Sequence, residues 1–196
     1  MDKKRICIGI DQSYSCSGFS VWEDGRLWKA FAVKPNGVNS EKRLTICKTV
    51  SELLFQERDF DDTVILCEAV RTQGMQNTSA DLIKAQASLI VCITDLAYSL
   101  GVETYTCNTT SWKKDVVGTS KPLENEYGVN PKKFPTIQYC VQQGYGKHIM
   151  EDPGKRKKGL IPSKSGKLWW PNDNIADAIC IGAYYFTGNP KLHKEH

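Results

Sequence analysis

The order of the apolar segments constrains the fold of this chain more than any other feature of its sequence. Strand-like segments come first, and helical and strand-like segments then alternate along the chain. The second and third strand-like segments are joined by Asp24-Gly25, a strong signal for a two-residue hairpin turn. The opening of the chain therefore predicts three antiparallel strands, at residues 5–11, 18–23 and 26–33.

The alternating part predicts helix, strand, helix and strand at residues 39–56, 63–70, 79–101 and 102–107. Asn39 or Ser40 is expected to cap the first helix, whereas Ser79 caps the second and Gly101 ends it. The apolar stripe expected on the first helix consists of Leu44, Cys47, Val50 and Leu54. A strand–helix–strand order implies parallel pairing with right-handed crossovers. We therefore expect an α/β fold whose mixed five-stranded sheet combines a three-strand antiparallel meander with two parallel strands, flanked by helices.

The remainder of the chain predicts helical segments near residues 110–117 and 131–143, a basic loop, and a last helix that begins near Asn172. The loop is rich in Gly, Pro and Lys, and we place it as an insertion at about residues 144–170. A length of 196 residues is that of one ordinary domain. We therefore expect a single domain over residues 1–196.

Composition limits the class of protein. A hydrophobic fraction of 40% and a charged fraction of 24% are typical of a globular domain. The first apolar run is too short for a signal peptide, and no segment is long enough to cross a membrane. The eight cysteines include no CxxC pair and mostly lie in apolar runs, so they predict buried thiols rather than disulfides or zinc ligands. We expect a soluble protein of the cytoplasm.

Charge is distributed unevenly along the chain. Residues 111–170 carry 12 Lys and Arg against 5 Asp and Glu, whereas the rest carries 14 against 17. A basic third on a mildly acidic body is typical of a face that binds a polyanion such as nucleic acid. A solvated, lysine-rich loop region would give the same pattern, so charge alone leaves both interpretations open.

Carboxylates interrupt the apolar pattern at three places. Asp11 ends the first predicted strand, and Glu68 lies at the end of the fourth. If these strands are parallel neighbours, both carboxylates emerge at the carboxyl edge of the sheet, where sites of open α/β sheets usually lie. Asp173 and Asp177 are four residues apart on the last helix and so share one of its faces. The sequence therefore predicts three or four acidic groups in one place.

Crowded carboxylates repel one another, and divalent cations offset that repulsion. An all-oxygen, carboxylate-rich site suits Mg²⁺ or Mn²⁺. Two such ions about 4 Å apart can stabilise both the attacking and the leaving oxygen of a phosphodiester displacement. Each acid also has a structural interpretation: Asp11 in an Asx turn, Glu68 as the end of a buried run, and Asp173 as a helix N-cap or as a first-turn acid favoured by the helix dipole. Nothing local explains Asp177 among its apolar neighbours.

Five segments together resemble the RuvC-type Holliday junction resolvases of the ribonuclease H-like superfamily, with a phage-type member as one candidate. They follow the family's order over most of the chain. The segments are IGIDQSYSCSGFSVW, VILCEAV, SADLIKAQASLIVC, TSWKKDVVGT and NDNIADAICIGAYY. The resemblance implies a ribonuclease H-like fold. It also implies a homodimer that pairs through the helix at residues 79–100.

The resemblance assigns roles to individual residues. Asp11, Glu68 and Asp177 would be catalytic metal ligands, and the fourth ligand would be Asp173 or Asn174, because the family's other acid falls at Asn174 here. Lys113 matches the family's catalytic lysine, with Lys114 beside it, and Lys132 or Lys133 matches a second one. A positive charge at these places would stabilise the charge that develops on a transferring phosphoryl group.

Two segments depart from the family's pattern. After the second acid, bacterial members carry an aromatic residue that wedges into the junction, whereas this chain offers Arg71 and Met75. The basic loop is longer than the family needs, and its cations are candidates for gripping DNA phosphates: Lys155, Arg156, Lys157 and Lys158. Trp169 and Trp170 follow it, either as a base-stacking edge or as part of the core.

The resemblance implies a crossover junction endonuclease that cuts four-way DNA junctions in pairs, with one or two Mg²⁺ or Mn²⁺ ions per protomer and 5′-phosphate products. A flap, branched-DNA or RNA-processing nuclease could use the same site. A non-catalytic junction-binding protein is a third possibility, since Asn174 stands where an acid is expected. A sugar kinase or actin-like ATPase is disfavoured, because those folds need two such domains.

Overall fold

The computed structural model describes residues 4–56, 62–70, 80–155, 158–162 and 166–195. Its main sheet has six strands in the order β3-β2-β1-β4-β5-β9. The strands are β1 (Ile6–Asp11), β2 (Ser17–Glu23), β3 (Arg26–Val33), β4 (Thr63–Glu68), β5 (Glu103–Cys107) and β9 (His193–Lys194). The mixed α/β fold expected from the sequence is confirmed, and β9 adds a sixth strand to the five that were predicted.

The pairing of the strands follows the predicted pattern. The meander β1-β2-β3 is antiparallel, whereas β4 pairs in parallel with both β1 and β5. The hairpin between β2 and β3 turns at Asp24 and Gly25, whose φ angles are 47° and 78°. Two consecutive positive φ angles define the turn that Asp-Gly favours. β9 pairs antiparallel with the outer edge of β5.

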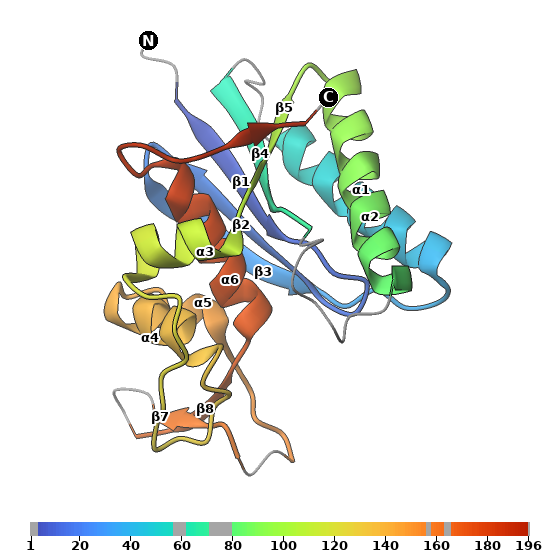
Figure 1. The fold of residues 1–196 in the computed structure, drawn as a ribbon. Coiled ribbons are helices and arrows are strands. Elements are labelled where there is room, and N and C mark those ends of the chain that lie inside the picture. Colours follow the sequence, from blue (N-terminus) through green and yellow to red (C-terminus); the bar gives the residue numbers. More distant parts are fainter. Residues whose placement is uncertain (1–3, 57–61, 71–79, 156–157, 163–165, 196) are drawn as a thin grey trace.

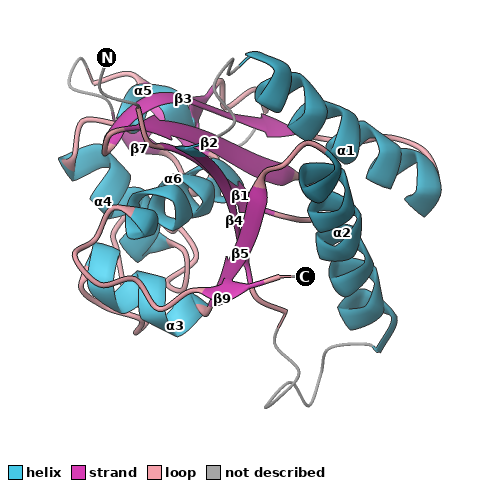
Figure 2. Ribbon diagram, turned by 90° about the horizontal axis from the view of Figure 1, so that it is seen from above, coloured by secondary structure: helices cyan, strands magenta, loops and turns pink. Residues whose placement is uncertain are grey.

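Helices cover both faces of this sheet (Figures 1 and 2). On one face lie α1 (Asn39–Gln56) and α2 (Ala80–Ser99), and the central helix of the other face is α6 (Asp173–Tyr185). Shorter helices pack around α6: α3 (Thr109–Trp112), the π-helix η2 (Lys113–Val117), α4 (Phe134–Gln142) and α5 (Gly146–Ile149). Gly101 ends α2 with a φ of 74°, as predicted, whereas Ser79 lies outside the described residues.

The α1 and α2 face is an aliphatic layer. Its buried residues on α1 are Ile46, Val50, Leu53 and Leu54. The predicted stripe is therefore partly wrong, because Leu44 is 70% exposed and Cys47 is only half-buried. Leu53 and Leu54 extend the apolar side of the last turns, which orients the helix so that Ile46 rather than Leu44 faces the sheet. No helix within the described ranges is long and apolar enough to cross a membrane.

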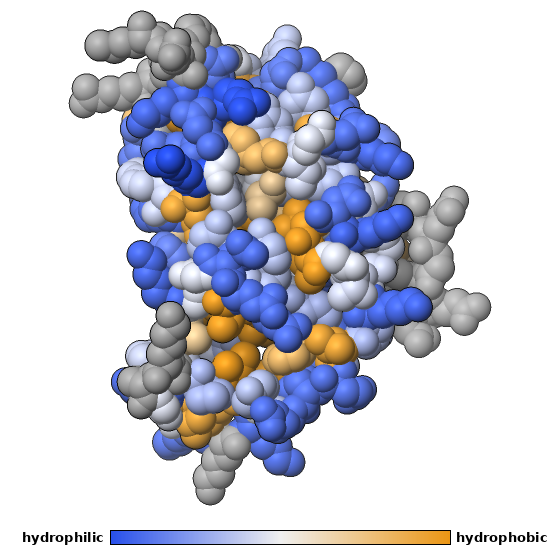
Figure 3. All heavy atoms as spheres, turned by 90° about the vertical axis from the view of Figure 1, so that its left-hand side faces the viewer, coloured by the Kyte–Doolittle hydropathy of each residue, from blue (hydrophilic) through white to orange (hydrophobic). Residues whose placement is uncertain are grey.

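The basic insertion is partly ordered into a second, small sheet. Its antiparallel strands β6 (Met150–Glu151), β8 (Leu168–Pro171) and β7 (Ile161–Pro162) lie side by side in that order. This sheet stands below α4 and α5 in Figure 1, and apolar side chains gather on the corresponding lower part of the surface in Figure 3. Trp169 and Trp170 are both half-buried in it. The predicted loop is thus a structured extension, whose residues 156–157 and 163–165 lie outside the described part of the chain.

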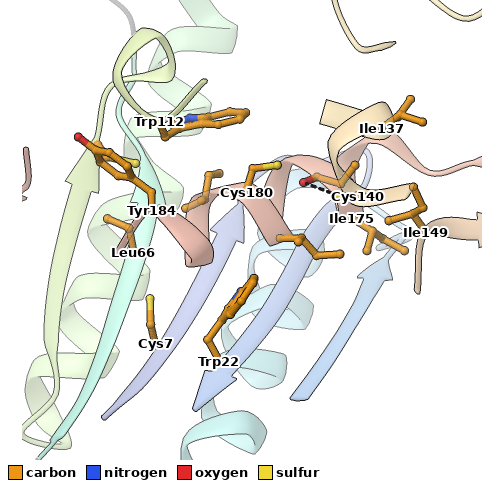
Figure 4. Close-up of a cluster of buried hydrophobic side chains, with 14 of the residues drawn as sticks. Cys7, Trp22, Leu66, Trp112, Ile137, Cys140, Ile149, Ile175, Cys180 and Tyr184 are labelled. Carbon is orange, nitrogen blue, oxygen red and sulfur yellow. Dashed lines mark hydrogen bonds between the residues drawn. The ribbon is translucent and has the colours of Figure 1, made fainter. Parts of the chain in front are cut away.

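α6 is buried between the main sheet and the shorter helices. Figure 4 shows Cys180 of α6 with Cys7, Trp22 and Leu66 of the sheet on one side and Trp112 on the other. The eight cysteines are free thiols, as expected. Burial raises the pKa of Cys7 and of Cys180 well above the usual thiol value, so these side chains serve as small apolar groups.

Candidate metal centre

Asn172 fixes the start of α6. Its side-chain Oδ1 accepts hydrogen bonds from the backbone N–H groups of Asn174 (3.1 Å) and Ile175 (3.2 Å). Its amide donates to Glu151 Oε1 at 2.6 Å, which ties the helix to the small sheet. Asp173 is therefore the first helical residue, so its interpretation as the N-cap is wrong, whereas its interpretation as a first-turn acid favoured by the helix dipole is confirmed.

Glycines let α6 approach the sheet closely. A Cβ on Gly9 would lie 2.5 Å from the backbone nitrogen of Gly182, and a Cβ on Gly18 would overlap the carbonyl oxygen of Asn174. Ser20 Oγ donates to the carbonyl oxygen of Ala178 at 2.7 Å and so fixes the position of α6 against the sheet. This contact holds Asp177, which is 4% exposed, against the end of β1.

Parallel pairing brings Asp11 and Glu68 to the same edge. Ile10 of β1 pairs with Cys67 of β4, so the next residue of each strand is one of the two acids. Loss of hydration raises the pKa of Asp11 well above its usual value, and the carboxylates of Asp177, Glu68 and Asp173 raise it further. Asp177, Glu68 and Asp173 therefore lie near enough to Asp11 to act on it at this edge of the sheet.

Lys133 supplies the positive charge of this cluster. Its Nζ donates to Asp177 Oδ2 at 2.8 Å and lies 3.3 Å from Asp173 Oδ2. Burial opposes the charge of this ammonium, but Asp177, Asp11 and Asp173 together raise its pKa above the usual lysine value. The sequence offered Lys132 and Lys133 as alternatives, and the structure brings Lys133 to the acids, whereas Lys132 is exposed.

Two residues that the sequence analysis missed orient Glu68. Gln12, only 5% exposed, donates from Nε2 to the Glu68 carbonyl oxygen at 2.5 Å and accepts the Glu68 N–H at 3.1 Å. The Thr109 hydroxyl donates to Glu68 Oε1. The position of Gln12 directly after Asp11 was the available signal, because an amide there can bridge two neighbouring strand ends.

The residues fit a divalent cation in chemistry, and the metal-free arrangement holds a lysine among them. Among the described residues, Asp177 Oδ1 is buried without a hydrogen-bond partner, so this oxygen is available as a ligand. The donor set is carboxylate oxygen, as Mg²⁺ and Mn²⁺ prefer. Within the described ranges, however, no three His, Cys, Asp or Glu side chains lie close enough to hold an ion together. The ammonium group of Lys133 lies against Asp173 and Asp177 at this place.

Four further predicted cations fall among the described residues. Lys113 begins η2, where its Nζ lies 5.1 Å from the centre of the Trp112 ring. Exposed lysines occur at Lys114, Lys155 and Lys158. Arg71, Met75, Arg156 and Lys157 lie outside the described residues.

Comparisons with known proteins match the fold and not the sequence. No family model matches the chain, and no curated protein sequence does. Among solved structures, RuvC of Thermus thermophilus aligns with a TM-score of 0.56 at 18% identity over 96% of this chain and 99% of that chain. The T. thermophilus RuvC structure in complex with Holliday junction substrate aligns with a TM-score of 0.57 at 17% identity over the same shares. The chain therefore has a RuvC-like, ribonuclease H-like fold, and these likenesses give no support to a phage-type assignment.

Proposed function

We propose that this protein is a metal-dependent endonuclease that resolves four-way DNA junctions by paired phosphodiester hydrolysis. The observation that carries the proposal is the gathering of Asp11, Glu68, Asp173 and Asp177 at one sheet edge, where the buried Asp177 Oδ1 has no hydrogen-bond partner among the described residues. The RuvC-like fold adds support, because a neighbour of that fold has been solved with junction DNA. A structural role for these acids would need no such convergence of like charges.

The acids at the site are the proposed metal ligands. Asp11, Glu68 and Asp177 would hold one or two Mg²⁺ or Mn²⁺ ions, with Asp173 or Asn174 as a further ligand. The metal supplies Lewis acidity, which activates an attacking water and offsets the charge of the phosphate. Water adds to phosphorus while the bond to the 3′ oxygen breaks, which leaves a 5′-phosphate and a 3′-hydroxyl. Asp173 is favoured over Asn174 because its carboxylate already contacts Lys133 within the cluster.

Lysines complete the proposed chemistry. With a cation held by Asp177, the ammonium group of Lys133 would be available to contact the phosphate and to stabilise the charge that develops there. Lys113, with Lys114 beside it, is the second proposed phosphate contact. Gln12 and Thr109 keep the Glu68 carboxylate aimed at the cation, so they position the site without touching the substrate.

A two-fold dimer would match a substrate with two equivalent strands to cut. We propose that the dimer forms through α2, because Val91 and Tyr98 on this helix are 56% and 83% exposed. Exposed apolar side chains of this size are typical of association surfaces. The basic residues of the insertion would then grip DNA phosphates and recognise shape more than sequence.

The test is cleavage of an end-labelled synthetic four-way junction in Mg²⁺ and in Mn²⁺. Linear duplex, flap DNA and RNA of matched sequence run beside it, and Asp11→Asn is the control for contaminating nucleases. Paired, symmetric nicks that disappear in the variant are the expected result. Preferential cutting of flap DNA or RNA would identify that nucleic acid as the substrate in place of the junction. Tight junction binding without cutting would contradict the enzymatic proposal.

A further inference from the structure

A cavity of about 320 Å³ opens beside the acidic cluster. Lys133 and Asp173 form its wall toward the acids, and Trp170 and Lys158 of the insertion line it farther away. It lies between the start of α4, the start of α6 and strand β8 of the small sheet. The cavity therefore adjoins the place where the cut bond would lie, and the proposed function makes no use of it.

Hydrogen bonds within two loops hold the cavity open. Asn125 Oδ1 accepts from the N–H groups of Tyr127 (3.2 Å) and Val129 (3.0 Å), and its Nδ2 donates to the Val129 carbonyl oxygen at 2.9 Å. The Gly159 N–H donates to the Tyr127 carbonyl oxygen at 3.1 Å, which joins this loop to the insertion. The wall formed by these loops is thus preorganised, as ligand pockets usually are.

The lining combines flat apolar surface with hydrogen-bonding groups and positive charge. Trp170, Val129 and Ile137 supply the apolar part, and Asn130 supplies an amide. Lys158 and Lys133 add two ammonium groups to the lining. An aromatic ring, an amide and flanking cations are the groups that bind an unstacked base together with its phosphates.

The cavity is large enough for a single nucleotide and no more. Its volume of about 320 Å³ lies at the small end of ligand pockets, which run from roughly 300 to 1,000 Å³. A base pair or a duplex segment is too large to enter, whereas a single base turned out of the stack can do so. Branch points favour such turning, because bases there have already lost part of their stacking.

We propose that this cavity receives one unstacked nucleotide of the DNA strand being cut and thereby influences where the strand is cut. The inference rests on the proposed nuclease function. Trp170 stacks on the base, Asn130 hydrogen-bonds its edge, and Lys158 contacts a neighbouring phosphate. Because Lys133 and Asp173 belong both to the cavity and to the acidic cluster, the bound nucleotide lies next to the scissile phosphate.

Binding can be tested without cleavage, by titrating thymidylyl and adenylyl dinucleotides into the ¹⁵N-labelled protein in EDTA. The expected result is a saturable shift of the Trp170 indole N–H signal, assigned by its loss in Trp170→Ala, with little change at Trp28 on β3. Trp170→Phe keeps a ring that can stack on the base, so it should bind within about tenfold of the wild type. An unchanged Trp170 signal at millimolar dinucleotide would overturn the inference.

Cutting preference gives the second test, with junctions that differ in one nucleotide on either side of the cut. Trp169→Ala is the matched control, because neighbouring residues of a strand point to opposite faces and Trp169 does not line the cavity. We expect the preference for one nucleotide over another at the cut to fall at least tenfold in Trp170→Ala and to be kept in Trp169→Ala. Equal losses of base preference in both variants would assign the effect to the small sheet as a whole. That result would contradict the binding of a nucleotide in the cavity. If the wild type cuts no junction, the proposed function fails, and the dinucleotide titration still decides whether the cavity binds a nucleotide.

Discussion

The two faces of the main sheet are built in different ways. The α1 and α2 face is a layer of aliphatic side chains, whose packing depends on volume and apolar character. On the α6 face, helix and sheet touch through the backbone at Gly9 and Gly182, and Trp22 and Trp112 fill the remaining space. The first face tolerates adjustment, whereas the second fixes one position of α6 and with it the position of Asp177. Stability is therefore shared by both faces, but the site depends on one of them.

The largest expected effect is the loss of cleavage in Asp177→Asn on the α6 face. The substitution removes a buried negative charge that would hold the cation, so cleavage should fall by at least about 10²–10³-fold. Single-turnover cleavage in Mn²⁺ measures the loss of activity, and calorimetric titration measures the affinity for Mn²⁺. An unchanged Mn²⁺ affinity would mean that Asp177 is not a ligand.

Leu54→Ala on the opposite face should affect stability alone. Leu54 is fully buried, so its truncation should lower the free energy of unfolding by about 2–5 kcal/mol. Urea unfolding measures this loss, and cleavage by the folded fraction should stay within about threefold of the wild type. A large loss of activity in well-folded Leu54→Ala would show that the two faces are not independent.

Gly182→Ala tests the backbone contact itself. The added methyl would overlap the Trp22 ring and approach Ser20 Oγ to 2.7 Å, so α6 must shift. Overpacking of this kind should destabilise the protein by about 1–3 kcal/mol, and it should also weaken Mn²⁺ binding. Gly188→Ala is the matched control, because no atom lies within 4 Å of its added methyl. Equal Mn²⁺ affinities in both variants would contradict the link between helix position and site.

The pH dependence of stability should differ between the two faces as well. Between the ordinary aspartate pKa and the raised pKa of Asp11, the folded metal-free protein binds more protons than the unfolded chain. Its stability should therefore fall as pH rises through the raised pKa. Urea unfolding in EDTA at several pH values should show this slope in the wild type and in Leu54→Ala. Asp11→Asn should reduce the slope, and saturating Mn²⁺ should do the same. A slope that neither change affects would show that Asp11 does not cause the pH dependence of stability.

The smallest effect is expected for Leu44→Ser. This side chain belongs to the predicted apolar stripe but is 70% exposed, so the free energy of unfolding should change by no more than about 0.5 kcal/mol. A loss comparable to that of Leu54→Ala in urea unfolding would mean that Leu44 is covered in solution.

Local sequence signals predicted the elements whose cause is local. The Asp24-Gly25 turn and the end of α2 at Gly101 follow from the dihedral preferences of these residues, and the structure has them. The bounds of α1 were also predicted, but the capping prediction was wrong, because Asn39 and Ser40 both lie inside the helix. The convergence of Asp11 and Glu68 was predictable too, because parallel neighbouring strands end at one edge. The metal-ligand roles of these acids remain a prediction.

Features that depend on contacts distant in the sequence were not predictable in the same way. Lys133 reaches Asp177 across 44 positions, and nothing in its own neighbourhood distinguishes it from Lys132. Gln12 acts on Glu68 across 56 positions. The strands of the insertion are only two to four residues long, too short for a periodic pattern to stand out.

The two-residue strand β9 has a consequence for the behaviour of the protein at high concentration. An open strand edge is a template on which other chains can add and aggregate. Here His193 and Lys194 pair along β5, the Glu195 N–H donates to the Thr104 carbonyl oxygen at 2.9 Å, and Thr106 Oγ1 donates to Glu195 Oε1 at 2.7 Å. These few residues close the edge with charged side chains and so disfavour growth of the sheet into fibrils from that side.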